Sequence, residues 1–93
     1  MINNLNRRVN RMSEQKDDFK YEITKELGVI GEGKHGWTKE VNFVRWNDRR
    51  QKLDIRDWNE THDKMGKGVT LSGPESRALL EVLNMTDLDL LDD

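Results

Sequence analysis

The 93-residue chain is 37% charged and 33% hydrophobic, and its formal net charge is -2. This length allows one domain, and the shortage of apolar residues predicts a small core that a partner subunit would enlarge. The absence of cysteine excludes disulfides and thiolate metal sites, and no apolar run suits a membrane span or a secretory signal. We therefore expect a soluble, cytoplasmic protein that does not bind membranes.

The charge is unevenly distributed along the chain. Residues 1–16 carry four bases and one acid, whereas residues 84–93 carry four acids and no base. A net negative charge argues against nucleic-acid binding, but the basic N-terminal part reopens that option. Residues 1–17 are predicted to form a flexible basic arm, with an amphipathic helix as the alternative. Residues 85–93 are predicted to form an acidic tail, either disordered or adding one helical turn.

The domain predicted over residues 18–84 begins with a strand. Phe19, Tyr21 and Ile23 alternate with polar residues, so they point to one side of an extended chain. We expect this strand to continue towards Ile30 and to end at the glycine-rich segment that follows.

A second strand is predicted over residues 37–46, which are rich in β-branched and aromatic residues. Its apolar residues do not alternate strictly, and a bulge near Phe43 would bring them to one face. Residues 47–50 then predict a polar turn that leads into the next strand.

The third predicted strand, residues 53–58, alternates cleanly. Leu53 and Ile55 are expected to face the core, which places Arg56 and Trp58 together on the opposite face. A tryptophan usually lies in the core, but an exposed indole beside a guanidinium would form a stacking platform. Stacking on such a ring contributes about 1–3 kcal/mol per base, so we interpret Trp58 as a binding residue.

A final strand and a helix complete the predicted fold. Residues 67–71 predict the strand, and Ser72 and Glu75 have the spacing of a capping box before an apolar stripe of leucines. The fold class is therefore α+β, an antiparallel four-stranded sheet followed by one helix (β-β-β-β-α). So short a helix covers part of one sheet face and leaves the other face for a ligand.

Further aromatic and basic residues are candidates for binding. Trp37 and Lys39 share one face of the second strand, and Trp46 ends it. For Trp37 and Trp46, a core position, a dimer contact and a binding role all stay open. Lys64 and Lys67 lie in a glycine-containing segment whose backbone amides suit phosphate contact, or which forms an ordinary hairpin connection.

Four segments occur in an order typical of one protein family. They are Trp37-Thr38-Lys39-Glu40-Val41-Asn42, Arg45-Trp46-Asn47, Asp54-Ile55-Arg56-Asp57-Trp58 and Lys64-Met65-Gly66-Lys67-Gly68-Val69-Thr70-Leu71. Over residues 19–83 the chain resembles the bacterial YdbC-type branch of the positive cofactor 4-like proteins, the family of a eukaryotic transcriptional coactivator. The resemblance implies a curved sheet and a homodimer formed through the helices and an adjoining strand, with single-stranded DNA crossing both sheets.

The residue pattern and the resemblance together give nine candidate nucleic-acid-binding residues. They are Trp37, Lys39, Asn42, Arg45, Trp46, Arg56, Trp58, Lys64 and Lys67. The resemblance implies the roles of Arg56 and Trp58 through the family's Asp-Ile-Arg-aromatic segment. The resemblance implies a binding role for Lys67 because this residue matches the base that precedes the family's last strand.

We expect single-stranded DNA binding with little sequence preference, without catalysis, metal or cofactor. The pathway would be replication, recombination, repair or transcription, in a bacterial cell or a phage-infected host. RNA binding and a transcription cofactor that binds protein are the alternatives, and the acidic tail is a candidate for competing with DNA or recruiting partners. An enzyme is disfavoured because His35 and His62 are interpreted as solvated loop residues without metal-ligand spacing.

Overall fold

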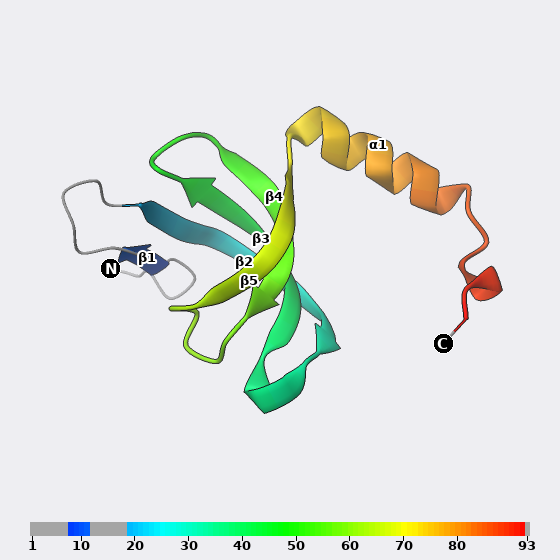
Figure 1. Cartoon of the computed structure of the whole chain (residues 1–93). Helices are drawn as coiled ribbons and strands as arrows, with labels where there is room; N and C mark the ends of the chain where they lie inside the picture. The colour runs from blue at the N-terminus through cyan, green and yellow to red at the C-terminus, as the bar shows by residue number, and fades with distance from the viewer. Residues whose placement is uncertain (1–7, 12–18, 93) are drawn as a thin grey trace.

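The computed structural model describes residues 8–11 and 19–92 of the chain. Within this part, five antiparallel strands form one sheet in sequence order, and a helix follows the last strand (Figure 1). The strands are β1 (Arg8–Arg11), β2 (Lys20–Glu32), β3 (Thr38–Trp46), β4 (Gln51–Trp58) and β5 (Met65–Leu71). Strands β2 to β5 and the helix confirm the predicted α+β class.

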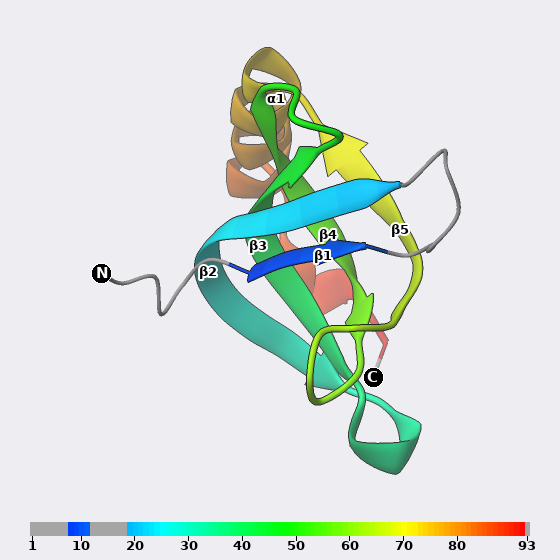
Figure 2. The same cartoon turned by 90° about the vertical axis from the view of Figure 1, so that its left-hand side faces the viewer.

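Strand β1 is an addition to the predicted sheet. It lies within the segment predicted to be a flexible arm, and it pairs antiparallel with residues 20–23 of β2 (Figure 2). A ladder of backbone hydrogen bonds needs no hydrophobic pattern, so side-chain alternation gave no signal for it. The rest of the predicted arm, residues 1–7 and 12–17, lies outside the described residues.

Strand β2 carries the irregularity that was predicted near Phe43. The pairing of β2 with β3 shifts register three times between Ile23 and Gly31, each time with an extra residue on β2. The first extra residue, Thr24, lies opposite Phe43 and donates a 3.3 Å hydrogen bond to its carbonyl oxygen. The bulge is therefore on the partner strand, and β3 keeps strict alternation. The predicted single apolar face of β3 is wrong, because Val44 faces the core while Val41 and Phe43 face the opposite side.

The core is small and lies on one face of the sheet. Its buried hydrophobic members, Tyr21, Ile23, Val44 and Trp58, are each at most 1% exposed. Phe19, Trp46 and Met65 pack against them and are partly buried. Register explains the grouping, because Tyr21 pairs with Trp46 and Ile23 with Val44 across β2 and β3.

Trp58 is the main correction to the sequence prediction. Alternation does place it on the same face as Arg56, but Trp58 is 0% exposed. Its ring centroid lies 5.3 Å from that of Tyr21 and 5.6 Å from that of His62. The face of β4 that carries Trp58 is thus the core face, because burying an indole removes more apolar surface from water than burying Leu53 on the other side.

Helix α1 (Gly73–Asn84) begins at the predicted capping box. The Ser72 hydroxyl accepts a hydrogen bond from the Glu75 amide at 3.2 Å, and the Glu75 carboxylate accepts one from the Ser72 amide at 2.8 Å. The helix then extends away from the sheet (Figure 1). Its side chains Leu80, Val82 and Leu83 are 42–60% exposed, so the described residues leave this apolar stripe largely uncovered.

The segment after the helix contains one short turn of 3-10 helix, η2 (Leu88–Leu90), and is exposed. This segment belongs to the predicted acidic tail. Among the described residues, no helix combines the length and apolar character needed to cross a membrane.

Candidate nucleic-acid interface

A cavity of about 420 Å³ opens on the core face of the sheet, next to the β3–β4 turn. It is lined by Phe19, Trp46, Arg49, Arg50, Lys52, Arg56, Met65 and Thr70. Four of these described lining residues are basic, two are aromatic and none is acidic. The cavity therefore combines positive charge with ring surface, which suits a ligand that has both phosphates and flat bases.

Two rings form the aromatic wall of the cavity. Trp46, the last residue of β3, stacks on Phe19 with ring centroids 5.6 Å apart and an interplanar angle of 27°. The Tyr21 ring lies 6.0 Å from that of Trp46 and connects this wall to the core. Trp46 and Phe19 are only half-buried, so ring surface is left for a ligand.

A tight turn carries the arginines of the cavity rim. Asn47 and Asp48 both have positive φ, 50° and 64°, and the Arg49 amide donates a 2.9 Å hydrogen bond to the carbonyl oxygen of Trp46. These are the features of a type I′ turn at Asn47–Asp48, a conformation that asparagine and aspartate tolerate better than most residues. The turn brings the exposed side chains of Arg49 and Arg50 to the cavity that Trp46 lines.

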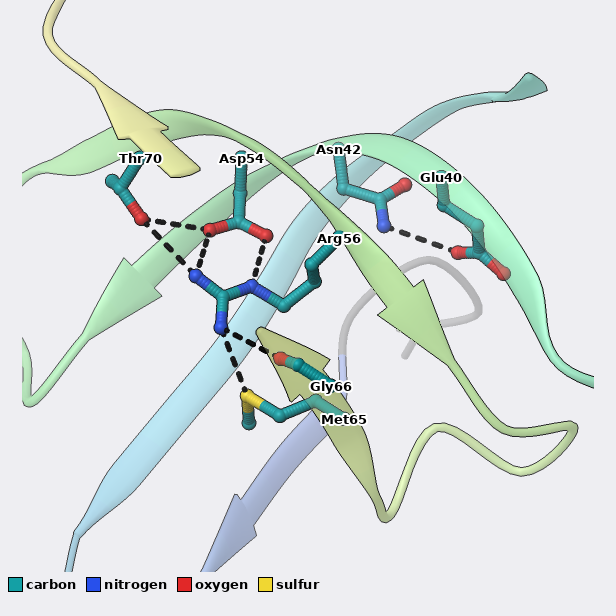
Figure 3. Close-up of polar contacts among 7 residues, drawn as sticks. All are labelled: Glu40, Asn42, Asp54, Arg56, Met65, Gly66 and Thr70. Atoms are coloured by element: carbon teal, nitrogen blue, oxygen red, sulfur yellow. Dashed lines mark hydrogen bonds and ion pairs between the residues drawn. The ribbon is translucent and has the colours of Figure 1, made fainter. Parts of the chain in front are cut away.

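Arg56 lines the cavity, and all three nitrogens of its guanidinium group donate hydrogen bonds within the chain (Figure 3). Its Nε and Nη2 donate to the two carboxylate oxygens of Asp54 at 2.6 and 2.9 Å. Its Nη1 donates to the Gly66 carbonyl oxygen at 3.3 Å and to the Met65 sulfur at 3.6 Å. Nη2 also donates to the Thr70 hydroxyl at 3.4 Å. The side chain of Asp54 is fully buried and that of Arg56 is 13% exposed.

A second polar cluster fastens the β4–β5 loop to the sheet. The Glu40 carboxylate accepts hydrogen bonds from Thr38 Oγ1 at 2.6 Å and Asn42 Nδ2 at 3.1 Å, and its nearer oxygen lies 2.9 Å from His62 Nε2. The Tyr21 hydroxyl donates a 2.6 Å hydrogen bond to the His62 carbonyl oxygen. His62, with a side chain only 13% exposed, is therefore not the solvated loop residue that was predicted.

These contacts change the acidity of Glu40. Burial raises the pKa of its carboxyl group, but the hydrogen bonds from Thr38, His62 and Asn42, with the charge of His62, outweigh burial and leave the pKa below its ordinary value. Glu40 is thus an ionised anchor for the loop. Among residues 8–11 and 19–92, no group of acids and histidines is arranged to hold a metal ion.

Several of the predicted site residues lie away from the cavity. Asn42 and Trp58 are at most 1% exposed and cannot meet a ligand in this structure. Trp37 is half-buried just before β3, where its amide donates to a loop carbonyl. Lys64 and Lys67 are exposed in the loop before β5 and in β5 itself, and neither lines the cavity.

The other two predicted bases lie on the opposite face of β3. By alternation, Lys39 and Arg45 point away from the side that carries Trp46. Lys39 forms an ion pair with Asp57 at 3.1 Å, and Arg45 forms one with Glu22 at 3.1 Å. Of the nine predicted residues, only Trp46 and Arg56 line the cavity.

Four lining residues with binding potential were not predicted. Arg49 and Arg50 were assigned to an ordinary polar turn, Lys52 preceded the predicted third strand, and Phe19 was assigned only to the first strand. The sequence did contain a signal for Lys52, because extending the strand by two residues places it on the face of Arg56. The side to which the two arginines project depends on the type I′ turn.

One comparison with known proteins matches a part of the chain that includes seven of the eight residues lining this cavity. The family model described as Transcriptional Coactivator p15 (PC4) matches residues 34–82, which include β3, β4, β5 and most of α1. An uncharacterized protein of Treponema pallidum (strain Nichols) is 45% identical over 73 residues, which cover 78% of this chain and 86% of that protein.

Proposed function

Because the chain belongs to the transcriptional coactivator p15 (PC4) family, we propose that it binds single-stranded DNA across the core face of its sheet. The observation that carries the proposal is the cavity, where the rings of Phe19 and Trp46 lie beside three exposed bases. These bases are Arg49, Arg50 and Lys52. Family membership supports nucleic-acid binding and a coactivator-like role, and the cavity provides a surface for the ligand.

The proposed mechanism is binding without catalysis. Unpaired bases stack on the exposed surface of Trp46 and Phe19, which contributes about 1–3 kcal/mol per base. Phosphates meet the arginines of the β3–β4 turn. A duplex binds less well because its bases already stack on one another, and sequence preference is weak because every base has a flat face.

We further propose that two copies of the chain associate. The proposal is supported by apolar residues on two surfaces. These are the exposed Leu80 and Leu83 of α1, and the half-buried Phe43 and Leu53 on the outer sheet face, which is the face opposite the core. Covering these residues with the same surfaces of a second chain would remove them from water. The core faces would stay open, so that the dimer would have two cavities for one DNA strand or two.

Titration of labelled oligo-dT at several salt concentrations tests the proposal. Trp46→Ala is expected to weaken binding about 5-fold to 150-fold, the equivalent of one lost stacking contact. Substitution of both Arg49 and Arg50 by alanine should reduce the slope of log K against log salt by about 1.4, since each phosphate contact on a single strand contributes about 0.7.

Lys25→Ala is the matched control. Lys25 is exposed on β2 and pairs in register with Phe43, on the face opposite the cavity. Lys25→Ala removes one positive charge outside the cavity, so affinity for an oligo-dT too short to reach a second cavity should stay within about 2-fold of the wild type. No binding of oligo-dT at low salt, or an equal loss in the control, would contradict the proposal. Equal affinity for oligo-U would widen the ligand class to RNA.

A further inference from the structure

We propose that Arg56 positions the Trp46 ring for stacking and makes no phosphate contact itself. The inference rests on the function proposed for this cavity and deepens it. It separates Arg56 from the other three bases of the cavity, Arg49, Arg50 and Lys52, which are exposed. Arg56 is thus a positioning residue, and the exposed bases attract the phosphates.

The guanidinium group of Arg56 already forms hydrogen bonds with other residues of the chain. A guanidinium group has five N–H donors, and those of Arg56 make five contacts within the chain (Figure 3). A phosphate could bind only by replacing one of these partners. The strongest of them is the Asp54 carboxylate, whose side chain is 0% exposed and would lose its countercharge.

The positive charge of Arg56 is neutralised by Asp54. Asp54 lies 2.6 Å from Arg56, so the two opposite charges cancel at the distance of a phosphate on the surface. Thr70 supports the pair from β5, because its hydroxyl accepts from Arg56 and donates to Asp54 at 2.8 Å. Arg56 therefore adds little to the electrostatic attraction of the cavity.

The guanidinium group of Arg56 also contacts the Trp46 ring. The Arg56 Cζ lies over the indole, 4.8 Å from the ring centroid, which is a cation–π distance. The two bonds to Asp54 fix the plane and position of the guanidinium. Phe19 also stacks on this ring, so Trp46 is held by two neighbours before a base arrives. A ring held in place loses less conformational entropy when it binds.

The experiment compares Arg56→Gln with the double variant Asp54→Asn/Arg56→Gln. The double variant leaves no unpaired carboxylate at residue 54, so it provides the test if the single variant fails to fold. Both are expected to bind oligo-dT about 10-fold more weakly at every salt concentration, with an unchanged salt slope. Arg49→Gln is the reference for a phosphate contact and should lower the slope by about 0.7. Arg56→Lys should not restore affinity, because an ammonium lacks the planar donor set.

A second readout is the indole N–H resonance of Trp46 in the free protein, assigned by its loss in Trp46→Phe. Both Arg56→Gln variants should shift it, whereas Lys25→Gln should not. A slope lowered by about 0.7 in a folded Arg56→Gln variant would make Arg56 a phosphate contact and overturn the inference. Wild-type affinity or an unshifted resonance would also overturn it. Failure of the wild type to bind oligo-dT would instead refute the proposed function.

Discussion

Trp46 and Trp58 lie on the same face of the sheet and differ in depth. Trp58 is fully buried against Tyr21, whereas Trp46 ends its strand at the cavity. Trp58→Ala should lower the free energy of unfolding by about 3–5 kcal/mol, because it leaves a cavity in a small core. Urea unfolding followed by circular dichroism measures this loss, with Trp46→Ala as the half-buried comparison. A stable Trp58→Ala protein that no longer binds DNA would contradict the core assignment.

Glu40 makes stability depend on pH. Its pKa is lower in the folded chain than its ordinary value of 4.5, so the unfolded chain binds the proton more tightly. The stabilisation is therefore present above pH 4.5 and is lost as the pH falls through the lower folded-state pKa. Glu40→Gln should lower stability at neutral pH by about 2 kcal/mol and flatten its decline in acid.

Urea unfolding at neutral pH and at about one pH unit below 4.5 measures both effects of Glu40→Gln. Glu60→Gln, in the exposed part of the β4–β5 loop, is the matched control and should behave like the wild type. An acid decline as steep in Glu40→Gln as in the wild type would show that other carboxyl groups carry the pH dependence.

For single residues, the sequence predicts which face of a strand a side chain lies on better than how deeply that side chain is buried. Alternation correctly groups Arg56 with Trp58, but burial depends on which strands lie alongside, and a single strand does not contain that information. The partners of Arg56 show the same limit. Its bond to Asp54 is visible as an i, i+2 pair, whereas its contacts with Met65 and Thr70 exist only once β4 and β5 have paired.

Between elements, β5 approaches β4 closely at Gly68. Gly68 pairs with Arg56, and an added Cβ would overlap the Arg56 Cβ and the Ile55 carbonyl oxygen. Gly68→Ala should therefore push β5 away and lower the free energy of unfolding by about 1–3 kcal/mol. It should also weaken oligo-dT binding, because Thr70 and Gly66 on β5 hold the guanidinium of Arg56.

Gly28→Ala is the matched control for this change. A Cβ at Gly28, in β2, would meet no atom within 4 Å, so stability should stay the same or rise slightly as the unfolded chain loses freedom. Chemical denaturation of the two variants decides the point. Equal stability of Gly68→Ala and Gly28→Ala would show that β5 can shift without cost.

Elements with a strong local signal could be predicted. Alternation indicated strands β2 and β4, the β-branched and aromatic composition of residues 37–46 indicated β3, and the Ser72–Glu75 capping box located the start of α1. The weakly patterned β1 could not, because only four residues pair and the partner is needed to recognise them. The family resemblance, which the comparisons confirm, predicted the sheet and helix but not which faces of the strands are buried.

At the scale of the whole molecule, the described residues leave much apolar surface uncovered. Its buried hydrophobic core consists of four described residues, while α1 exposes Leu80, Val82 and Leu83. So small a core contributes little net stability to a domain of this size. Association of two copies through the helix and the outer sheet face would add the missing buried surface.

Leu83→Glu tests this association. The wild type should sediment with twice the chain mass of 11.0 kDa, and the variant should move towards the single-chain mass because a carboxylate buried in an apolar contact is strongly unfavourable. Asn84→Glu adds the same charge at the next exposed helix position and should stay dimeric. A wild-type protein that sediments with the single-chain mass at micromolar concentration would contradict the dimer.

Leu83→Glu also tests whether association of two copies strengthens DNA binding. A dimer with two cavities holds a long oligonucleotide at both, so the second contact forms at high effective concentration and raises the overall affinity. A short oligonucleotide reaches one cavity and gains nothing. Leu83→Glu should therefore lose affinity for long oligo-dT while keeping wild-type affinity for short oligo-dT, which fluorescence anisotropy can measure. Equal losses for both lengths would mean that the helix acts on the cavity itself rather than through a second copy of it.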